Sequence, residues 1–273
     1  HATQKINVFS TVHVPLFHPF VVAKMGATLA HMSGGRWGLN VVSGWSEREF
    51  GMMGMELPEH GLRYKKTAAF IEILHGLWTS AEQPFNYDSQ WYTVRNGGSL
   101  PRPHTAPELA HAGTTADAQA ITARMCDWAF MSLPDVEAAA ALVQSVQSQA
   151  EGHGRNVRTA VFPFLLWRDS LAEAEDELAL IIAKKDQVAA GNWLHDLTAG
   201  SGSFDEFTSD MLAASGGGVH MLGDAAGVAE QLRDVYQSGV DAVMLTFQHY
   251  EEDLQRFAVE VLPLLKRMGV VAQ

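Results

Sequence analysis

The stretch SGGRWGLNVVSGW, residues 33–45, is the strongest indication of fold class, because it joins a helix end to a buried strand through a glycine turn. Gly34 and Gly35 allow the positive φ at which helices commonly end. The apolar run 37–42 that follows is typical of a parallel strand buried on both faces. Asn40 interrupts this run, and a buried amide must either bond neighbouring backbone or meet a polar ligand.

Strand-like and helix-like segments alternate along the rest of the chain. Short segments rich in β-branched and aromatic residues predict strands, and longer segments with one apolar face predict helices. A strand followed by a helix, repeated, is typical of an α/β fold with a parallel sheet covered by helices. The predicted strands are 6–12, 37–42, 108–112, 128–131, 159–167 and 242–247, and the predicted helices are 20–32, 61–78, 115–125, 135–152, 171–190 and 227–238.

Two stretches interrupt the alternation. Residues 79–107 are too long for a simple loop, and we expect them to carry a small hairpin at the rim of the fold. Residues 191–218 are rich in Gly and Ser with scattered aromatic residues, a composition that suits a mobile loop or short helices. A lid over an active site and a plain surface insertion are equal alternatives for this second stretch.

Composition excludes several classes of protein. The formal net charge is −12, and no stripe of Lys and Arg is present, which argues against a nucleic-acid partner. No apolar run approaches the roughly 18 residues that a membrane span requires. The single cysteine, Cys126, cannot form an internal disulfide and is expected to be a buried small hydrophobe in a reducing cytoplasm. No histidine or cysteine spacing of metal sites occurs, nor a G-x-S-x-G elbow, a Walker loop or a Rossmann fingerprint.

Four blocks of sequence, in order, resemble one known family, the bacterial luciferase-like flavin monooxygenases. The similarity is greatest to the branch that contains the reduced-FMN-dependent pyrimidine and dimethylsulfone (alkanesulfonate-type) monooxygenases. It covers nearly the whole chain and is looser over residues 166–218. The blocks are INVFSTVHVPLFHPFVVAKMGATLAHMSGGRWGLNVVSGWSEREFGMMG with LRYKKTAAFIEILHGLWTS, then SLPRP, AHAGTTADAQAITARMCDWAF and GVDAVMLTFQHYEEDLQRFAVEVLPLL.

The resemblance implies a (β/α)8 TIM barrel of the luciferase-like type. We expect residues 1–273 to form one such domain, with rim insertions near 79–107 and 191–218. The first residue is His1, and a predicted strand follows at once, where members of the family already have two βα units. We therefore expect the chain to lack the first two βα units of the barrel, which would leave unpaired strand edges.

The resemblance also implies an oxidoreductase of the two-component kind. A separate NAD(P)H:flavin reductase supplies reduced FMN, which reacts with O2 to give a flavin peroxide that oxygenates a small organic substrate. Sulfones or sulfonates and nitrogen heterocycles are the substrate classes implied. There are two alternatives. One is a deazaflavin-dependent oxidoreductase of the same superfamily, and the other is a shortened barrel that binds flavin without turnover. We expect a cytoplasmic homo-oligomeric flavoprotein that binds neither nucleic acid nor a membrane.

Thr11, Asn40 and His13 are the candidate catalytic residues. Thr11 and Asn40 stand near the ends of two predicted strands and match family positions beside the flavin that help to place dioxygen. Fixed hydrogen-bonding groups in a dry pocket stabilise developing charge far better than water does. His13 lies in the loop after the first predicted strand, where an imidazole can orient a substrate or shuttle a proton, or serve a structural role. His18 and His249 are further candidates of the same kind.

Asn40 and Glu49 are expected to contact the flavin ring or its ribityl chain. Glu49 follows Asn40 by nine residues and matches a flavin-contacting carboxylate of the family. A carboxylate only accepts hydrogen bonds, which suits a flavin N–H or the ribityl hydroxyls. A solvated acid in the SEREF turn is the alternative for Glu49.

Arg63, Tyr64 and Thr115 are expected to bind the flavin phosphate. Arg63 and Tyr64 open a predicted helix and match an Arg-Tyr pair that binds this phosphate in relatives. Arg offers a fork of donors, and the positive end of a helix dipole favours an anion. Adjacent helix residues rarely point the same way, so the alternative is that only one of the two binds and the other packs, in which case Arg63 ranks slightly above Tyr64. Thr115 fills the place of a family serine at the start of another helix, with Thr114 as the adjacent alternative.

Overall fold

The computed structural model describes residues 2–80, 84–201 and 208–271. Parts of both predicted insertions, residues 81–83 and 202–207, therefore lie outside the described residues. The chain divides into two compact units. Unit 1 comprises His1–Ala129 and Gln149–Val157, and unit 2 comprises Phe130–Ser148 and Arg158–Gln273.

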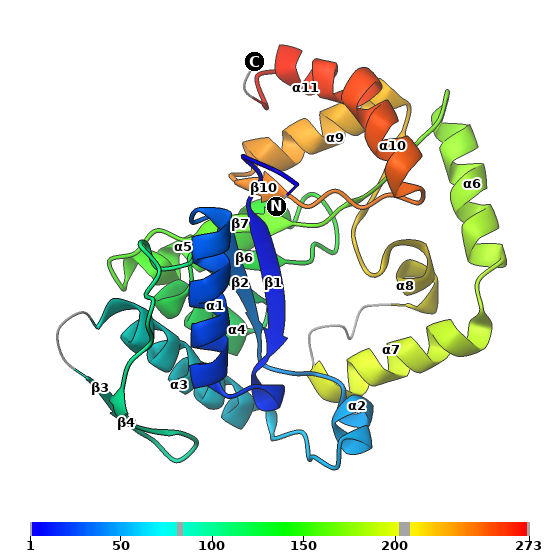
Figure 1. Cartoon of the computed structure of the whole chain (residues 1–273). Helices are drawn as coiled ribbons and strands as arrows, with labels where there is room; N and C mark the ends of the chain where they lie inside the picture. The colour runs from blue at the N-terminus through cyan, green and yellow to red at the C-terminus, as the bar shows by residue number, and fades with distance from the viewer. Residues whose placement is uncertain (1, 81–83, 202–207, 272–273) are drawn as a thin grey trace. The chain divides into compact units, whose positions relative to one another are not determined.

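Unit 1 is built on three parallel strands, with β2 (Trp37–Val42) between β1 (Val8–His13) and β5 (Leu109–Ala112) (Figure 1). Each strand leads into a helix, which confirms the predicted alternation. These helices are α1 (Pro19–Ser33), α3 (His60–Thr79) and α4 (Ala116–Met125). Gly34 ends α1 with a φ of 65°, and its N–H donates to carbonyls of the last turn, as the glycine pair predicted.

The strand register sets the positions of the candidate catalytic residues. Thr11 of β1 pairs with Asn40 of β2, and Asn40 pairs with Ala110 of β5. Both Thr11 and Asn40 lie two residues before the last residue of their strands, slightly earlier than predicted. Neighbouring residues of a strand point to opposite faces, so His111 of β5, which pairs with Val41, points away from the Asn40 face.

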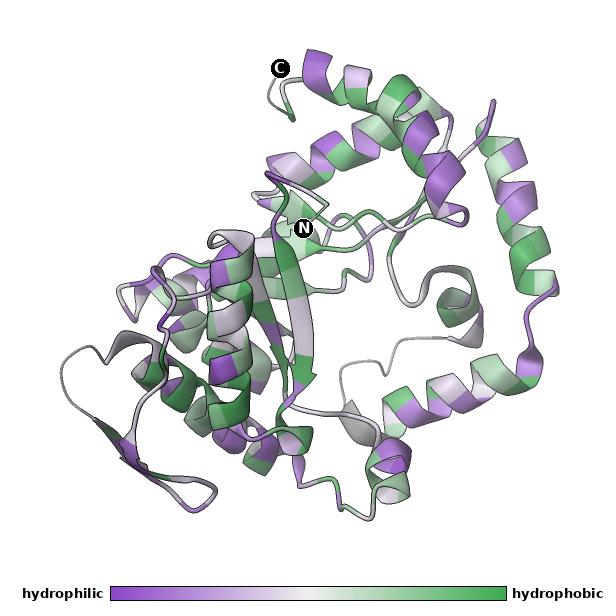
Figure 2. Ribbon diagram, viewed as in Figure 1, coloured by the Kyte–Doolittle hydropathy of each residue, from purple (hydrophilic) through white to green (hydrophobic). Residues whose placement is uncertain are grey.

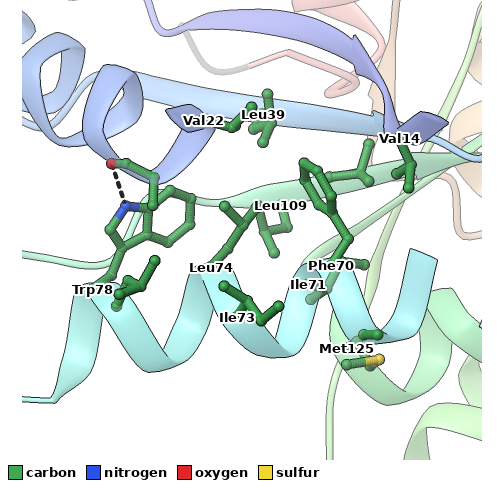
Figure 3. Close-up of a cluster of buried hydrophobic side chains, with 14 of the residues drawn as sticks. Val14, Val22, Leu39, Phe70, Ile71, Ile73, Leu74, Trp78, Leu109 and Met125 are labelled. Carbon is green, nitrogen blue, oxygen red and sulfur yellow. Dashed lines mark hydrogen bonds between the residues drawn. The ribbon is translucent and has the colours of Figure 1, made fainter. Parts of the chain in front are cut away.

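The core of unit 1 is formed mainly by α3, which packs against β2 and β5. Its fully buried apolar residues point toward Leu39 of β2 and Leu109 of β5 (Figure 3). The indole N–H of Trp78 donates to the carbonyl of Ala23 on α1 at 2.9 Å, so the one polar atom of this ring is satisfied inside the core. Burial of each large apolar side chain stabilises the fold by about 1.5–3 kcal/mol. The residues concerned include Phe70, Ile71, Ile73, Leu74 and Trp78.

The hairpin expected within residues 79–107 is present. Strands β3 (Phe85–Asp88) and β4 (Thr93–Gly97) pair antiparallel (Figure 1). A methyl group at Gly76 of α3 would overlap the ring of Phe85, so the glycine lets the hairpin lie directly on this helix. The position of the hairpin at a barrel rim stays a prediction.

Unit 2 contains two parallel strand pairs. Strand β7 (Arg158–Val161) pairs with β10 (Ala242–Val243), and β8 (Phe164–Trp167) pairs with β9 (His220–Gly223). The prediction of one strand over 159–167 is therefore wrong, because Pro163 lacks a backbone N–H and separates two strands that pair with different partners. Strand β6 (Trp128–Met131) has its predicted bounds.

The predicted helix over 171–190 is two helices, α6 (Leu171–Ala183) and α7 (Gln187–Ser201). The carboxylate of Asp186 accepts from the N–H groups of Val188 and Ala189 at 2.9 Å, which starts a new helix. Apolar and polar residues are mixed along both helices (Figure 2), and some large apolar side chains, among them Leu180 of α6 and Trp193 of α7, are exposed. The described residues also contain α5 (Ala139–Glu151), α8 (Ser209–Ser215), α9 (Ala225–Gln237), α10 (Tyr250–Arg256) and α11 (Leu262–Arg267).

The remaining expectations concern residues 191–218 and the absence of a membrane-spanning helix. Helices α7 and α8 occupy most of the described part of 191–218, and a lid role for this stretch stays a prediction. Among these same residues, no helix has the length and apolar character needed to cross a bilayer.

Candidate active site

Thr11 and Asn40 lie side by side on the same face of the unit 1 sheet. The Asn40 Nδ2 donates to Thr11 Oγ1 at 3.4 Å, and Asn40 is half-buried. Its Oδ1 is buried and has no hydrogen-bond partner among the described residues. An unsatisfied buried carbonyl oxygen costs about 1–3 kcal/mol, so this atom is suited to accept from a donor on a ligand. An N–H group of a flavin is such a donor.

His13 lies two residues beyond Thr11 and therefore on the same side of β1. Burial lowers the pKa of His13 below its usual value, and the negative charge of Glu49 opposes this shift. A neutral imidazole offers one donor and one acceptor. Glu49 is exposed in the short helix α2 (Glu47–Met52), and its N–H donates to the capping hydroxyl of Ser46 at 3.2 Å.

Arg63 is a buried cation of α3 that bonds the backbone after β2. Its side chain donates to the Gly44 carbonyl at 2.6 Å, and the residue is only 6% exposed. Burial lowers the pKa of Arg63. Gly44 has a φ of 98°, a backbone conformation that favours glycine. Arg63 thus fixes the loop that follows β2, and its contact with a phosphate stays a prediction.

Tyr64 points to a different partner from Arg63, as expected for adjacent helix residues. The Tyr64 hydroxyl lies 3.2 Å from Thr115 Oγ1, and Thr115 caps α4 by accepting from the Ala118 N–H at 3.3 Å. Burial raises the pKa of the Tyr64 hydroxyl, which keeps it a neutral donor. Because Thr115 caps α4, the alternative residue Thr114 is the threonine whose side chain does not serve as the cap, and its contact with a phosphate also stays a prediction.

His60 also belongs to this cluster, although the sequence analysis did not identify it. The His60 ring centroid lies 4.9 Å from that of Tyr64, and its Nδ1 lies 3.3 Å from an oxygen of Asp117. The first turns of α3 and α4 therefore meet at two hydroxyls, an imidazole and the carboxylate of Asp117. Backbone N–H groups at helix N-termini, together with such donors, favour an anion, and a phosphate fits them chemically. His60 precedes Tyr64 by four residues, a spacing that places two residues on the same face of a helix. This spacing could have identified His60 as a neighbour of Tyr64.

A buried polar cluster behind the sheet was likewise missed. Ser43 Oγ lies 3.2 Å from His111 Nε2, and Thr67 Oγ1 lies 2.9 Å from both Ser43 Oγ and the Arg63 carbonyl. Ser43, Thr67 and His111 are all buried. The cluster joins the ends of β2 and β5 to the turn of α3 that carries Arg63 and Tyr64, so it positions the candidate phosphate site.

Burial lowers the pKa of His111 to about 4, so this residue makes the stability of the fold pH-dependent. As the pH falls from about 6.5 toward 4, the unfolded chain binds a proton that the folded chain does not, and about 1.4 kcal/mol of stability is lost per pH unit. We expect His111→Gln, which does not titrate, to flatten this dependence. Urea unfolding at several pH values measures it, with the exposed His195→Gln as the matched control. Equal pH dependence of wild type and His111→Gln would contradict the assignment.

Comparisons with known proteins bear on this arrangement. The family described as luciferase-like monooxygenase matches residues 1–242. An FMNH(2)-dependent dimethylsulfone monooxygenase from Pseudomonas putida is 31% identical and covers 98% of this chain and 76% of its own length. A pyrimidine monooxygenase RutA from Allorhizobium ampelinum is 27% identical, over 97% of this chain and 75% of that relative. The crystal structure of riboflavin lyase RcaE matches 99% of this chain and 72% of its own, with a TM-score of 0.86 and 19% identity.

These similarities confirm the predicted fold class. The structural match identifies an α/β fold of the luciferase-like TIM-barrel type. The chain spans about three quarters of the length of the two relatives above. The absence of two βα units and the single domain over residues 1–273 stay predictions. From the family match over residues 1–242 and the 31% identity to the P. putida enzyme, we conclude that the chain belongs to the luciferase-like monooxygenase family.

Proposed function

We propose that this chain is a two-component monooxygenase that uses reduced FMN and O2 to oxygenate a small organic substrate. The observation that carries the proposal is the unpartnered buried Oδ1 of Asn40 beside Thr11, in the same unit as the cluster at Tyr64 and Thr115. The Oδ1 of Asn40 accepts from a flavin N–H, and the cluster at Tyr64 and Thr115 donates to the flavin phosphate. The relatives named as FMNH(2)-dependent monooxygenases support this reading.

In this proposal, different residues of unit 1 bind the flavin phosphate and orient the flavin ring. Tyr64, Thr115 and His60 hold the phosphate, and Arg63 fixes the loop after β2 and adds positive charge. Reduced FMN, when bound, supplies the electrons that activate dioxygen. Thr11 and Asn40 orient the ring and donate hydrogen bonds where charge develops. Glu49 accepts from a ribityl hydroxyl or a ring N–H, and the His13 imidazole holds or moves a proton at one of its nitrogens.

Substrate and partners follow from the same proposal. The relatives are named for dimethylsulfone and for pyrimidines, so we propose a sulfone, a sulfonate or a nitrogen heterocycle as the substrate. A separate NAD(P)H:flavin reductase supplies the reduced FMN, and the enzyme works as a homo-oligomer. The single cysteine, Cys126, is buried and burial raises its pKa, which suits an inert thiol in the cytoplasm. Names that specify FMNH(2) favour this proposal over a deazaflavin-dependent oxidoreductase or a binder without turnover.

The phosphate site is tested by comparing FMN with riboflavin, which lacks the phosphate. We expect Tyr64→Phe to weaken FMN binding by roughly 2- to 10-fold, because it removes one neutral hydrogen bond, and to leave riboflavin binding unchanged. Titration calorimetry measures both affinities. Tyr236→Phe on α9, an exposed tyrosine, is the matched control. Equal losses for the two ligands, or wild-type protein that binds riboflavin as tightly as FMN, would contradict the proposal.

A further inference from the structure

A carboxylate lies among the residues of the candidate phosphate site. Asp117 stands in the first turn of α4, two residues after Thr115, whose Oγ1 lies 3.2 Å from the Tyr64 hydroxyl. An Asp117 oxygen lies 3.3 Å from His60 Nδ1, and the centroid of the His60 ring lies 4.9 Å from that of Tyr64. Asp117 therefore shares the site with the three side chains that we assign to the phosphate.

No permanent cation pairs with Asp117. In the described part of the chain, His60 is the one ion-pair partner of this carboxylate. An imidazole, unlike the side chains of Lys and Arg, is not a permanent cation. The positive end of the α4 dipole favours an anion, and the Asp117 carboxylate is already there to interact with it. A phosphate that binds at the start of α4 therefore meets a resident negative charge.

The charge of Asp117 reaches the hydroxyl that would bind the phosphate. Burial is the main cause of the raised pKa of Tyr64, and among the nearby charges Arg63 opposes this rise whereas Asp117 adds to it. Arg63 and Asp117 thus act on the same hydroxyl with opposite signs. A phosphate bound at Tyr64 Oη would be attracted by Arg63 and repelled by Asp117.

We propose that Asp117 limits the affinity of this chain for FMN by repelling the flavin phosphate, so that FMN exchanges with the solution after each turnover. The inference rests on the proposed function, because a separate reductase can deliver reduced FMN only to a site that oxidised FMN has left. The hydroxyls of Tyr64 and Thr115 recognise the phosphate, and the Asp117 carboxylate keeps it from being held tightly.

Two structural roles of Asp117 lead to different expectations. An acid in the first turn of a helix stabilises the helix through its dipole, and this role alone predicts no change in FMN affinity when the charge is removed. A carboxylate that holds the His60 ring toward the phosphate would be a positioning residue, and its loss would weaken FMN binding. Repulsion predicts the opposite sign, because removal of the charge then tightens binding.

Asp117→Asn is the decisive variant, because it keeps the size of the side chain and an oxygen that accepts from His60. At about pH 8, where a phosphate monoester is a dianion, it should raise the affinity of the full chain for oxidised FMN roughly 3- to 10-fold. The factor is modest because the Asp117 side chain is 54% exposed and water screens its charge. Titration calorimetry measures the affinity, and stopped-flow fluorescence should show slower release of FMN.

Three comparisons control this measurement. Riboflavin, which lacks the phosphate, should bind Asp117→Asn and wild type equally well. Asp117→Glu, which keeps the charge, should bind FMN like wild type. Asp176→Asn, at an exposed position of α6, removes one negative charge elsewhere in the chain and should alter neither affinity.

Salt separates repulsion from a change in local structure. At an ionic strength of about 1 M, where the screening length is about 3 Å, the advantage of Asp117→Asn over wild type should fall below about twofold. An Asp117→Asn protein that binds FMN no more tightly than wild type, or a gain that persists at high salt, would overturn this inference and leave the proposed function intact. Equal gains for FMN and riboflavin would also overturn it. Wild-type protein that binds neither flavin would overturn the proposed function itself.

Discussion

Replacement of Asn40 by alanine is expected to lower the yield of oxygenated product per reduced FMN consumed by about 10²- to 10³-fold. The substitution removes both the Nδ2 that bonds Thr11 and the buried Oδ1 that is free to accept from a ligand. These groups matter most where charge develops after oxygen reacts, so reduced flavin should still bind while hydrogen peroxide is released instead of product. Parallel assays of oxygen consumption, peroxide and product measure this uncoupling.

Asn156→Ala is the control for this variant, because Asn156 is an exposed asparagine of unit 1 outside the candidate site. It should keep the wild-type product yield. A normal product yield per flavin oxidised in Asn40→Ala would refute the role assigned to Asn40.

Replacement of Arg63 by methionine is expected to lower the free energy of unfolding by about 2–3 kcal/mol. Methionine keeps much of the apolar volume but leaves the Gly44 carbonyl without the donor that now lies 2.6 Å away. Hydrogen bonds to charged groups are the stronger kind, and the residue is 94% buried. Urea unfolding monitored by tryptophan fluorescence measures the change.

Arg267→Met, at an exposed position of α11, is the matched control and should change stability by less than about 0.5 kcal/mol. An equally small change in Arg63→Met would contradict the structural role of Arg63. The same variant separates its two possible contributions to binding. A loss confined to FMN indicates contact with the phosphate, whereas equal losses of FMN and riboflavin indicate an effect through the loop at Gly44.

Much of the fold was predictable because its signals are local. Strands β2 and β6 have their predicted bounds, since each is an apolar run flanked by a helix end or a turn. Strand β9 was missed because its four residues, HMLG, include no β-branched residue and no Phe, Tyr or Trp, and they follow closely on a glycine-rich stretch. The two strands within 159–167 were merged although Pro163 stands between them, and their different partners identify them as separate strands.

Individual residues of the candidate site were predictable from strand ends and from the family resemblance, but most contacts between them were not. Thr11 and Asn40 were identified from strand ends and resemblance, and the register then placed them opposite each other. The contact between Ser43 and His111 joins residues 68 positions apart, so no local pattern could indicate it. The bond between Arg63 and Gly44 similarly depends on how α3 packs against the loop after β2. Tertiary packing, rather than local propensity, sets these contacts.

The central claim is that unit 1 holds reduced FMN between Asn40 and the cluster at Tyr64 and Thr115. A crystal structure of the full chain with reduced FMN, prepared without oxygen, tests it most directly. We predict phosphate oxygens within hydrogen-bond distance of Tyr64 Oη and Thr115 Oγ1, and a ring N–H directed at Asn40 Oδ1. A flavin bound elsewhere in the chain, or one whose phosphate contacts neither hydroxyl, would contradict the account.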